Sequence, residues 1–166
     1  MKIKLIALVR GYAGKHVCLL AIADTDSQQI AISNPLDFNN KYPKDDNTII
    51  VTDSPNLVND YHLAFREAEH LKEAIVCYEE LHQAAKITLK EHACDPSVVL
   101  QTFKVDTKGK QKEFNTDELN NAHIATLLIV WAARRAFLNH QITNSLNQES
   151  DQDELDNDDF STPFLI

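Results

Sequence analysis

Glycine and cysteine are scarce in this chain, and no apolar run is long. Three glycines in 166 residues leave little material for a glycine-rich phosphate loop. Three cysteines, an odd number, argue against a disulfide framework. The longest apolar stretch, 124–137, contains two arginines and is too short to cross a bilayer. A five-residue apolar run near the N-terminus is too short for a signal peptide, so we expect a soluble, cytoplasmic protein.

Lysine and arginine are absent from the last nineteen positions, 148–166, although this segment holds seven carboxylates. Without it, eighteen acids face sixteen bases, so residues 1–147 are nearly neutral and the net charge of −9 comes mostly from the end of the chain. A body of this size can form one hydrophobic core. The sequence therefore predicts a single α+β domain over 1–147 and an acidic C-terminal tail over 148–166.

The first third of the chain has the apolar patterning of β-strands. Lys2–Val9 first alternates between basic and apolar residues and then becomes apolar on both faces, as expected of a strand inside a sheet. A polar loop over 34–47 follows the third apolar run. These patterns predict a small, mostly antiparallel sheet of about five strands. The predicted strands are Lys2–Val9, His16–Ala23, Gln29–Ser33, Thr48–Val51 and Val98–Val105.

A helical period replaces the strand pattern after Ser54–Pro55, which fits an N-cap followed by proline at the first helical position. From Leu57 to Leu89, apolar residues recur at alternating spacings of four and three. We expect one long amphipathic helix of about 38 residues, which ends before Asp95–Pro96 because the residue preceding a proline avoids the helical region. The heptad pattern leaves self-association open.

The last predicted helix begins at Asn115, which forms a variant of the capping box with Glu118, and runs to about Asn144. Its middle is apolar on nearly all sides, which predicts a buried C-terminal helix.

Asp53 gives the most specific hint of chemistry, because it follows an apolar strand in the string Thr52-Asp53-Ser54. The order strand–strand–strand, connector, strand–helix–strand–helix is similar to the ribonuclease H-like fold. The resemblance implies a metal-dependent nuclease in which Asp53, with Asp117 or Glu118, binds Mg²⁺. Capping of the following helix is the alternative role for Asp53.

The resemblance fails at the first strand, where the family's essential Asp would fall near Val9 and Arg10. It fails again over 34–47, where a loop replaces the family's acid-bearing helix. We therefore predict no catalytic residue outside this rival interpretation, and no cofactor other than its Mg²⁺. The pairs His16/Cys18 and His92/Cys94 lack the Cys-x₂₋₄-Cys spacing of structural zinc sites.

Two groups of basic residues are candidates for contact with nucleic acid, and each has an aromatic residue beside it. They leave a single-stranded nucleic-acid-binding protein as a further alternative. Lysines that protect the edges of a sheet from aggregation are the simpler explanation. The groups are Lys2, Lys4, Arg10 and Lys15, and Lys104, Lys108, Lys110 and Lys112.

The C-terminal tail resembles the tails of bacterial and phage single-stranded-DNA-binding proteins, which end in an acidic run followed by Pro-Phe. Asp158-Asp159-Phe160 and Pro163-Phe164 carry the resemblance, although Leu165 and Ile166 follow the last Phe. Such a tail combines charge steering toward a basic surface with apolar side chains that fill a pocket. It either binds a partner or packs on its own domain.

These observations predict a non-enzymatic interaction protein that binds a protein partner with a basic surface. A nucleic-acid-processing protein is one class of partner that fits. The acidic face of the long helix is the second expected contact. The tail residues expected at the contact are Phe160, Phe164, Leu165, Ile166, Asp156, Asp158 and Asp159.

Overall fold

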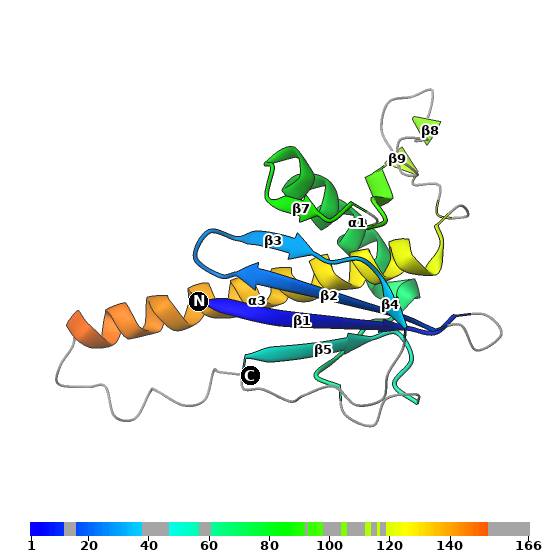
Figure 1. Ribbon diagram of the computed structural model, residues 1–166. Coiled ribbons are helices and arrows are strands. Elements are labelled where there is room, and N and C mark those ends of the chain that lie inside the picture. Colours follow the sequence, from blue (N-terminus) through cyan, green and yellow to red (C-terminus); the bar gives the residue numbers. More distant parts are fainter. Residues whose placement is uncertain are drawn as a thin grey trace.

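The computed structural model describes residues 1–11, 16–37, 47–56, 61–91, 93–97, 104–105, 112–113, 116 and 119–152. In these residues the chain has an α+β fold, as predicted: a mixed β-sheet carries two helices, α1 (Glu67–Gln83) and α3 (Asn121–Gln152) (Figure 1). In this described part, no helix is long and apolar enough to span a membrane.

In the described residues the main sheet has seven strands: six follow the order β6-β5-β1-β2-β3-β7, and the seventh, the short strand β4, pairs with β2. Strands β1, β2 and β3 are antiparallel neighbours, whereas β5 is parallel to β1, β6 to β5 and β7 to β3. The bounds are β1 Lys2–Val9, β2 Val17–Asp24, β3 Gln29–Ile32, β4 Leu36–Asp37, β5 Thr48–Thr52, β6 Leu63–Ala64 and β7 Ile87–Leu89.

The prediction of a mostly antiparallel sheet is wrong, because three of its strand pairs are parallel. Parallel neighbours need a connection that returns the chain to the starting end of the sheet. Alternation of apolar residues reports which side of a strand is buried, but it does not report the direction of the neighbouring strand.

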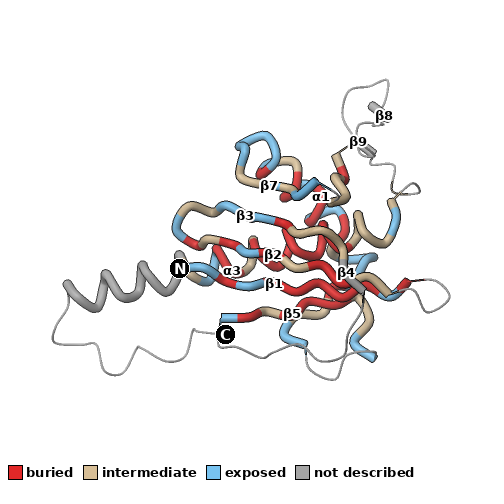
Figure 2. The backbone as a smooth tube through the Cα atoms, in the orientation of Figure 1, coloured by how far each residue is buried: buried red, intermediate tan, exposed pale blue. Residues whose placement is uncertain are grey.

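Strand β1 lies inside the sheet between β2 and β5, and its burial follows the predicted pattern. Lys2 and Lys4 are exposed, whereas every residue from Leu5 to Val9 is buried. Side chains on odd positions of β1 point into the main core beneath the helices, while Ile6 and Leu8 belong to a smaller apolar cluster on the other side. Figure 2 shows buried residues concentrated along the central strands and α3.

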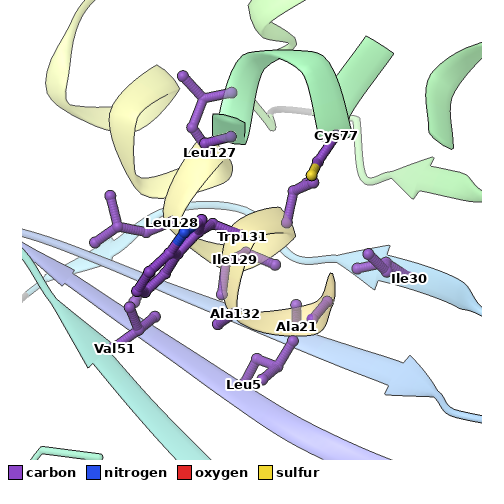
Figure 3. Packing of buried hydrophobic residues seen from close by; sticks show 14 of the residues in the cluster. Leu5, Ala21, Ile30, Val51, Cys77, Leu127, Leu128, Ile129, Trp131 and Ala132 are labelled. Carbon is purple, nitrogen blue, oxygen red and sulfur yellow. The ribbon is translucent and has the colours of Figure 1, made fainter. Parts of the chain in front are cut away.

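The buried C-terminal helix is confirmed, because α3 is buried at every residue from Ala125 to Ala133. It contacts β1, β2, β3 and β5 on one side and α1 on the other. Figure 3 shows core side chains that α3, α1 and the sheet contribute, including Leu128, Trp131 and Ala132 of α3.

The predicted long helix is wrong in length, because α1 covers only Glu67–Gln83. No helix starts at Ser54–Pro55; the chain turns there, and after 57–60, which lie outside the described residues, it forms β6 beside β5. Arg66 is the N-cap of α1 and supplies no capping hydrogen bond from its side chain. The start of α1 therefore carries no N-cap signal that the sequence could reveal.

The end of α1 is a Schellman motif with alanine in the position that usually holds glycine. The backbone N–H of Ala85 donates to the carbonyl of His82 at 3.1 Å, and that of Lys86 donates to Leu81 at 2.9 Å. Ala85 has φ of 56°, in the left-handed region that glycine enters most easily. Without glycine as a stop signal, the apolar rhythm continues in the sequence after the helix ends.

The last helix begins at Asn121, later than the predicted start at Asn115; Asn115 and Glu118 lie outside the described residues. Asn120 and His123 form the capping box instead. The Asn120 Oδ1 accepts from the backbone N–H of His123 at 2.9 Å, and the Asn120 N–H donates to Nδ1 of His123 at 3.2 Å.

The C-terminal end of α3 also differs from the prediction, since the helix runs to Gln152 rather than to about Asn144. It includes the first residues of the segment that we set apart as the tail. The predicted strand Val98–Val105 is described only at β8 (Lys104–Val105), which pairs with β9 (Lys112–Glu113) in a separate antiparallel two-stranded sheet.

Candidate functional site

Asp53 lies directly after β5, beside the end of the parallel strand β1. Its Oδ1 accepts hydrogen bonds from the backbone N–H of Arg10 at 3.2 Å and from the Ser54 hydroxyl at 3.1 Å. The preceding Thr52 donates from its hydroxyl to the carbonyl of Leu8 at 2.9 Å. The ends of β1 and β5 are thus joined by side chains as well as by the strand ladder.

Burial raises the pKa of the Asp53 carboxyl above its usual range, although hydrogen bonds from Arg10 and Ser54 and the charge of Arg10 act in the opposite direction. A half-buried carboxylate of this kind is a plain candidate for a functional group. Asp53 does not cap a helix that begins at residues 54–56, because the chain forms a turn there and not a helix.

The residue beside Asp53 at the end of β1 is Arg10, and this agrees with the departure from the ribonuclease H-like pattern noted in the sequence. Among the residues that the structure describes, no three His, Cys, Asp or Glu side chains are grouped closely enough to hold a metal ion. Asp117 and Glu118, the other ligands of the rival interpretation, lie outside those residues.

The acidic helix face is present on α1, where Glu67, Glu69, Glu73 and Glu80 are exposed and Glu79 is half-buried. Val76 lies at its centre and is 44% exposed. Because residues three and four apart are neighbours on a helix, this valine lies beside Glu73, Glu79 and Glu80 and also beside the exposed Lys72. The predicted long helix would also include Asp60 and Glu91, but Glu91 follows β7 and Asp60 is outside the described residues.

Arginines from α3 lie against this acidic face, which the sequence did not predict. The Arg135 Nη2 lies 3.9 Å from the Glu73 Oε2, and the Arg134 Nη1 lies 3.6 Å from the Glu80 Oε2. The negative surplus of the face is therefore smaller than the helix sequence alone suggests. The side chains of both pairs are exposed, so each pair contributes little to the stability of the fold.

Tyr78 of α1 forms a hydrogen-bonded group with Asp95 and Ser97, in which Tyr78 is buried and the other two residues are half-buried. The Tyr78 hydroxyl donates to Asp95 Oδ1 at 2.5 Å, and the Ser97 N–H and hydroxyl donate to the same oxygen at 2.9 and 2.6 Å. Burial raises the pKa of the Tyr78 phenol. Burial also acts to raise the pKa of Asp95, but the hydrogen bonds from Ser97 and Tyr78 outweigh it and the pKa lies below its usual value. The group joins α1 to the chain before α3.

The two predicted basic groups lie in different sheets. Lys2 and Lys4 are exposed on β1 of the main sheet, whereas Lys104 and Lys112 belong to the separate sheet formed by β8 and β9 (Figure 1). Within the first group, Arg10 lies about 20 Å along the strand direction from Lys4, given about 3.3 Å per residue. Lys15, Lys108 and Lys110 lie outside the described residues.

The tail residues that we expect at a partner contact, from Asp156 to Ile166, also lie outside the described residues. No protein-family model, curated protein or solved structure matches this chain.

Proposed function

We propose that this protein is a non-enzymatic, cytoplasmic interaction protein that binds a basic protein partner through its C-terminal tail and the outer face of α1. The α1 face carries the proposal: an exposed apolar residue, Val76, has three glutamates (Glu73, Glu79 and Glu80) and one lysine (Lys72) as its neighbours on the helix. Protein interfaces commonly combine an apolar centre with a polar rim. The tail adds seven carboxylates without a compensating base.

The class of partner follows from charge. A partner with a basic surface would approach faster because of the acidic tail, and its encounter rate would fall with salt. Proteins that process nucleic acid have such surfaces. The resemblance of the tail to those of single-stranded-DNA-binding proteins supports this class.

Affinity capture with the full chain tests the proposal. Two substituted chains, Val76→Lys with Glu80→Lys and Phe164→Ala with Ile166→Ala, are compared with the parent and with Leu138→Lys as the control. Leu138 is 46% exposed on α3, so it matches the exposure of Val76 without belonging to the face. We expect both substituted chains to lose a partner that the parent and control retain. Equal recovery by all four chains would overturn the proposal.

A ribonuclease H-like nuclease remains a second candidate, and one observation favours it. Strands β3, β2, β1 and β5 are neighbours in that order, and Asp53 follows β5 beside the end of β1. Release of nucleotides from single-stranded and duplex substrates with Mg²⁺ or Mn²⁺ tests this candidate. Activity in the parent that disappears in Asp53→Asn would favour it over the interaction protein.

A further inference from the structure

The main sheet has a second face, opposite α3, on which strands β1, β2, β3 and β5 contribute alternate side chains. The register places Ile22 beside Lys4, Leu20 beside Ile6, and Cys18 beside Leu8. Since α3 contacts the other side of these strands, neither described helix covers this second face (Figure 1). We call it the outer sheet face.

One half of the outer sheet face is buried and the other half is open. Ile6, Leu8, Cys18 and Ile50 are at most 2% exposed. In contrast, Ile22 is 51% exposed although β2 is an internal strand. Its cross-strand neighbours Lys4 and Ala31 are exposed too. The open half of the outer sheet face therefore combines one apolar side chain, Ile22, with the basic side chain of Lys4.

The C-terminal tail has this complementary chemistry. Carboxylates such as Asp158 and Asp159 match Lys4, which has the apolar Ile22 as its cross-strand neighbour, whereas Lys2 has Asp24 beside it. The apolar residues from Phe160 to Ile166 match Ile22 and Ala31. The other long segment outside the described residues, 38–46, contains two lysines and two aspartates and has no net charge. Charge therefore favours the tail as the occupant.

The tail is also long enough to reach this face. His140 of α3 lies 3.3 Å from Asp26 in the turn between β2 and β3, so α3 passes the end of the sheet that holds Lys2. Between His140 and Gln152 the helix advances by about 18 Å. Residues 153–166 span up to about 48 Å when extended, so they can return along that length and continue to Ile22.

We propose that residues 153–166 dock in cis on the outer sheet face, with tail carboxylates at Lys4 and the apolar end over Ile22 and Ala31. The inference rests on the role of the tail as a recognition segment in the proposed function, but it requires no partner. Docking in cis places the apolar residues against the sheet, so that a partner has to compete with the protein's own strand surface.

Methyl NMR on the full chain tests the docking. We expect nuclear Overhauser effects between the Ile22 methyl groups and the rings of Phe160 or Phe164, independent of protein concentration. Phe160→Ala with Phe164→Ala should shift the Ile22 methyl resonances and leave those of Val76 unchanged. Lys4→Glu should abolish the Overhauser effects, whereas Lys72→Glu, a charge reversal at an exposed lysine of α1, should not.

Three outcomes would overturn the docking. The first is that the Ile22 resonances are identical in the parent and in the double Phe variant. The second is that the Overhauser effects persist unchanged in Lys4→Glu. The third is that the Overhauser effects grow with protein concentration, which would mean that the tail of a second copy binds. In Ile22→Ser the tail signals should sharpen as the segment is released, and this variant keeps the test independent of the Phe substitutions. Affinity capture reports separately on the partner, so either proposal can fail alone.

Discussion

Arg135 lies over the indole ring of Trp131, with 4.2 Å between its Cζ atom and the ring centroid. His70 of α1 lies against the same ring with 4.7 Å between centroids, and Phe65 meets it edge-on at 5.2 Å. The Trp131 Nε1 is buried and has no hydrogen-bond partner in the described part of the chain. Aromatic and cation–π contacts therefore hold this side chain at the junction of α1 and α3.

Arg135→Ala is expected to destabilise the fold, because it removes both the cation over Trp131 and the cover of the ring. A partly desolvated cation–π contact contributes about 1–2 kcal/mol to the free energy of unfolding. Arg134→Ala is the matched control, since the two arginines have 40% and 41% exposed side chains and each pairs with one glutamate of α1. Its loss should be below about 1 kcal/mol. Urea unfolding measures both, and equal losses would contradict a special role for the contact with Trp131.

Ala85→Gly is expected to stabilise the protein by about 0.5–1 kcal/mol, because glycine adopts the left-handed conformation without a steric cost. Ala85 is exposed, so no packing is lost. Ala84→Gly is the control: Ala84 has φ of −80°, where glycine brings no relief and loses more chain entropy on folding. Thermal unfolding should show a higher midpoint for Ala85→Gly and an unchanged or lower one for Ala84→Gly.

The predictable part of the fold is the part in which local burial decides structure. Lys2–Val9 was predicted with its exact bounds because alternation and then full burial are encoded in its own residues. The bounds of α1 were not predictable, since its Schellman motif uses Ala85 and its N-cap Arg66 gives no side-chain signal. The two-residue strand β6 is too short for any periodicity to show.

The candidate sites illustrate the same limit. The acidic residues of α1 are visible in the sequence, but Arg134 and Arg135 reach them only because α3 packs against α1. The exposure of Ile22 depends equally on where the helices lie, because an apolar residue in an apolar strand predicts burial. The spacing of apolar residues within one segment does not encode which distant segment that one will contact.

His123 makes the start of α3 sensitive to acid. Burial lowers the pKa of His123, and its Nδ1 accepts the N–H of Asn120 only while it is unprotonated. Because the folded-state pKa lies below the unfolded value of about 6.5, the stabilisation is complete above that pH and is lost as pH falls through the lowered pKa. His123→Gln keeps a capping-box residue that does not titrate. The free energy of unfolding of the parent should therefore fall more steeply below pH 6.5 than that of His123→Gln; parallel curves would contradict this role.

Asp53→Asn distinguishes the electrostatic cost of this carboxylate from its hydrogen-bonding role. Because burial raises the pKa of Asp53, the folded protein binds its proton more tightly than the unfolded chain does, and stability is lost as pH rises through the raised pKa. Asparagine cannot ionise, but its Oδ1 can still accept from the Arg10 N–H and the Ser54 hydroxyl. We expect Asp53→Asn to be at least as stable as the parent at pH 7, with a difference that shrinks toward pH 4.

Asp53→Ala removes the acceptor as well and should cost about 1 kcal/mol relative to Asp53→Asn. Urea unfolding at the two pH values measures these differences. A large loss of stability in Asp53→Asn at pH 7 would instead mean that the negative charge itself is needed, as it would be beside a bound cation.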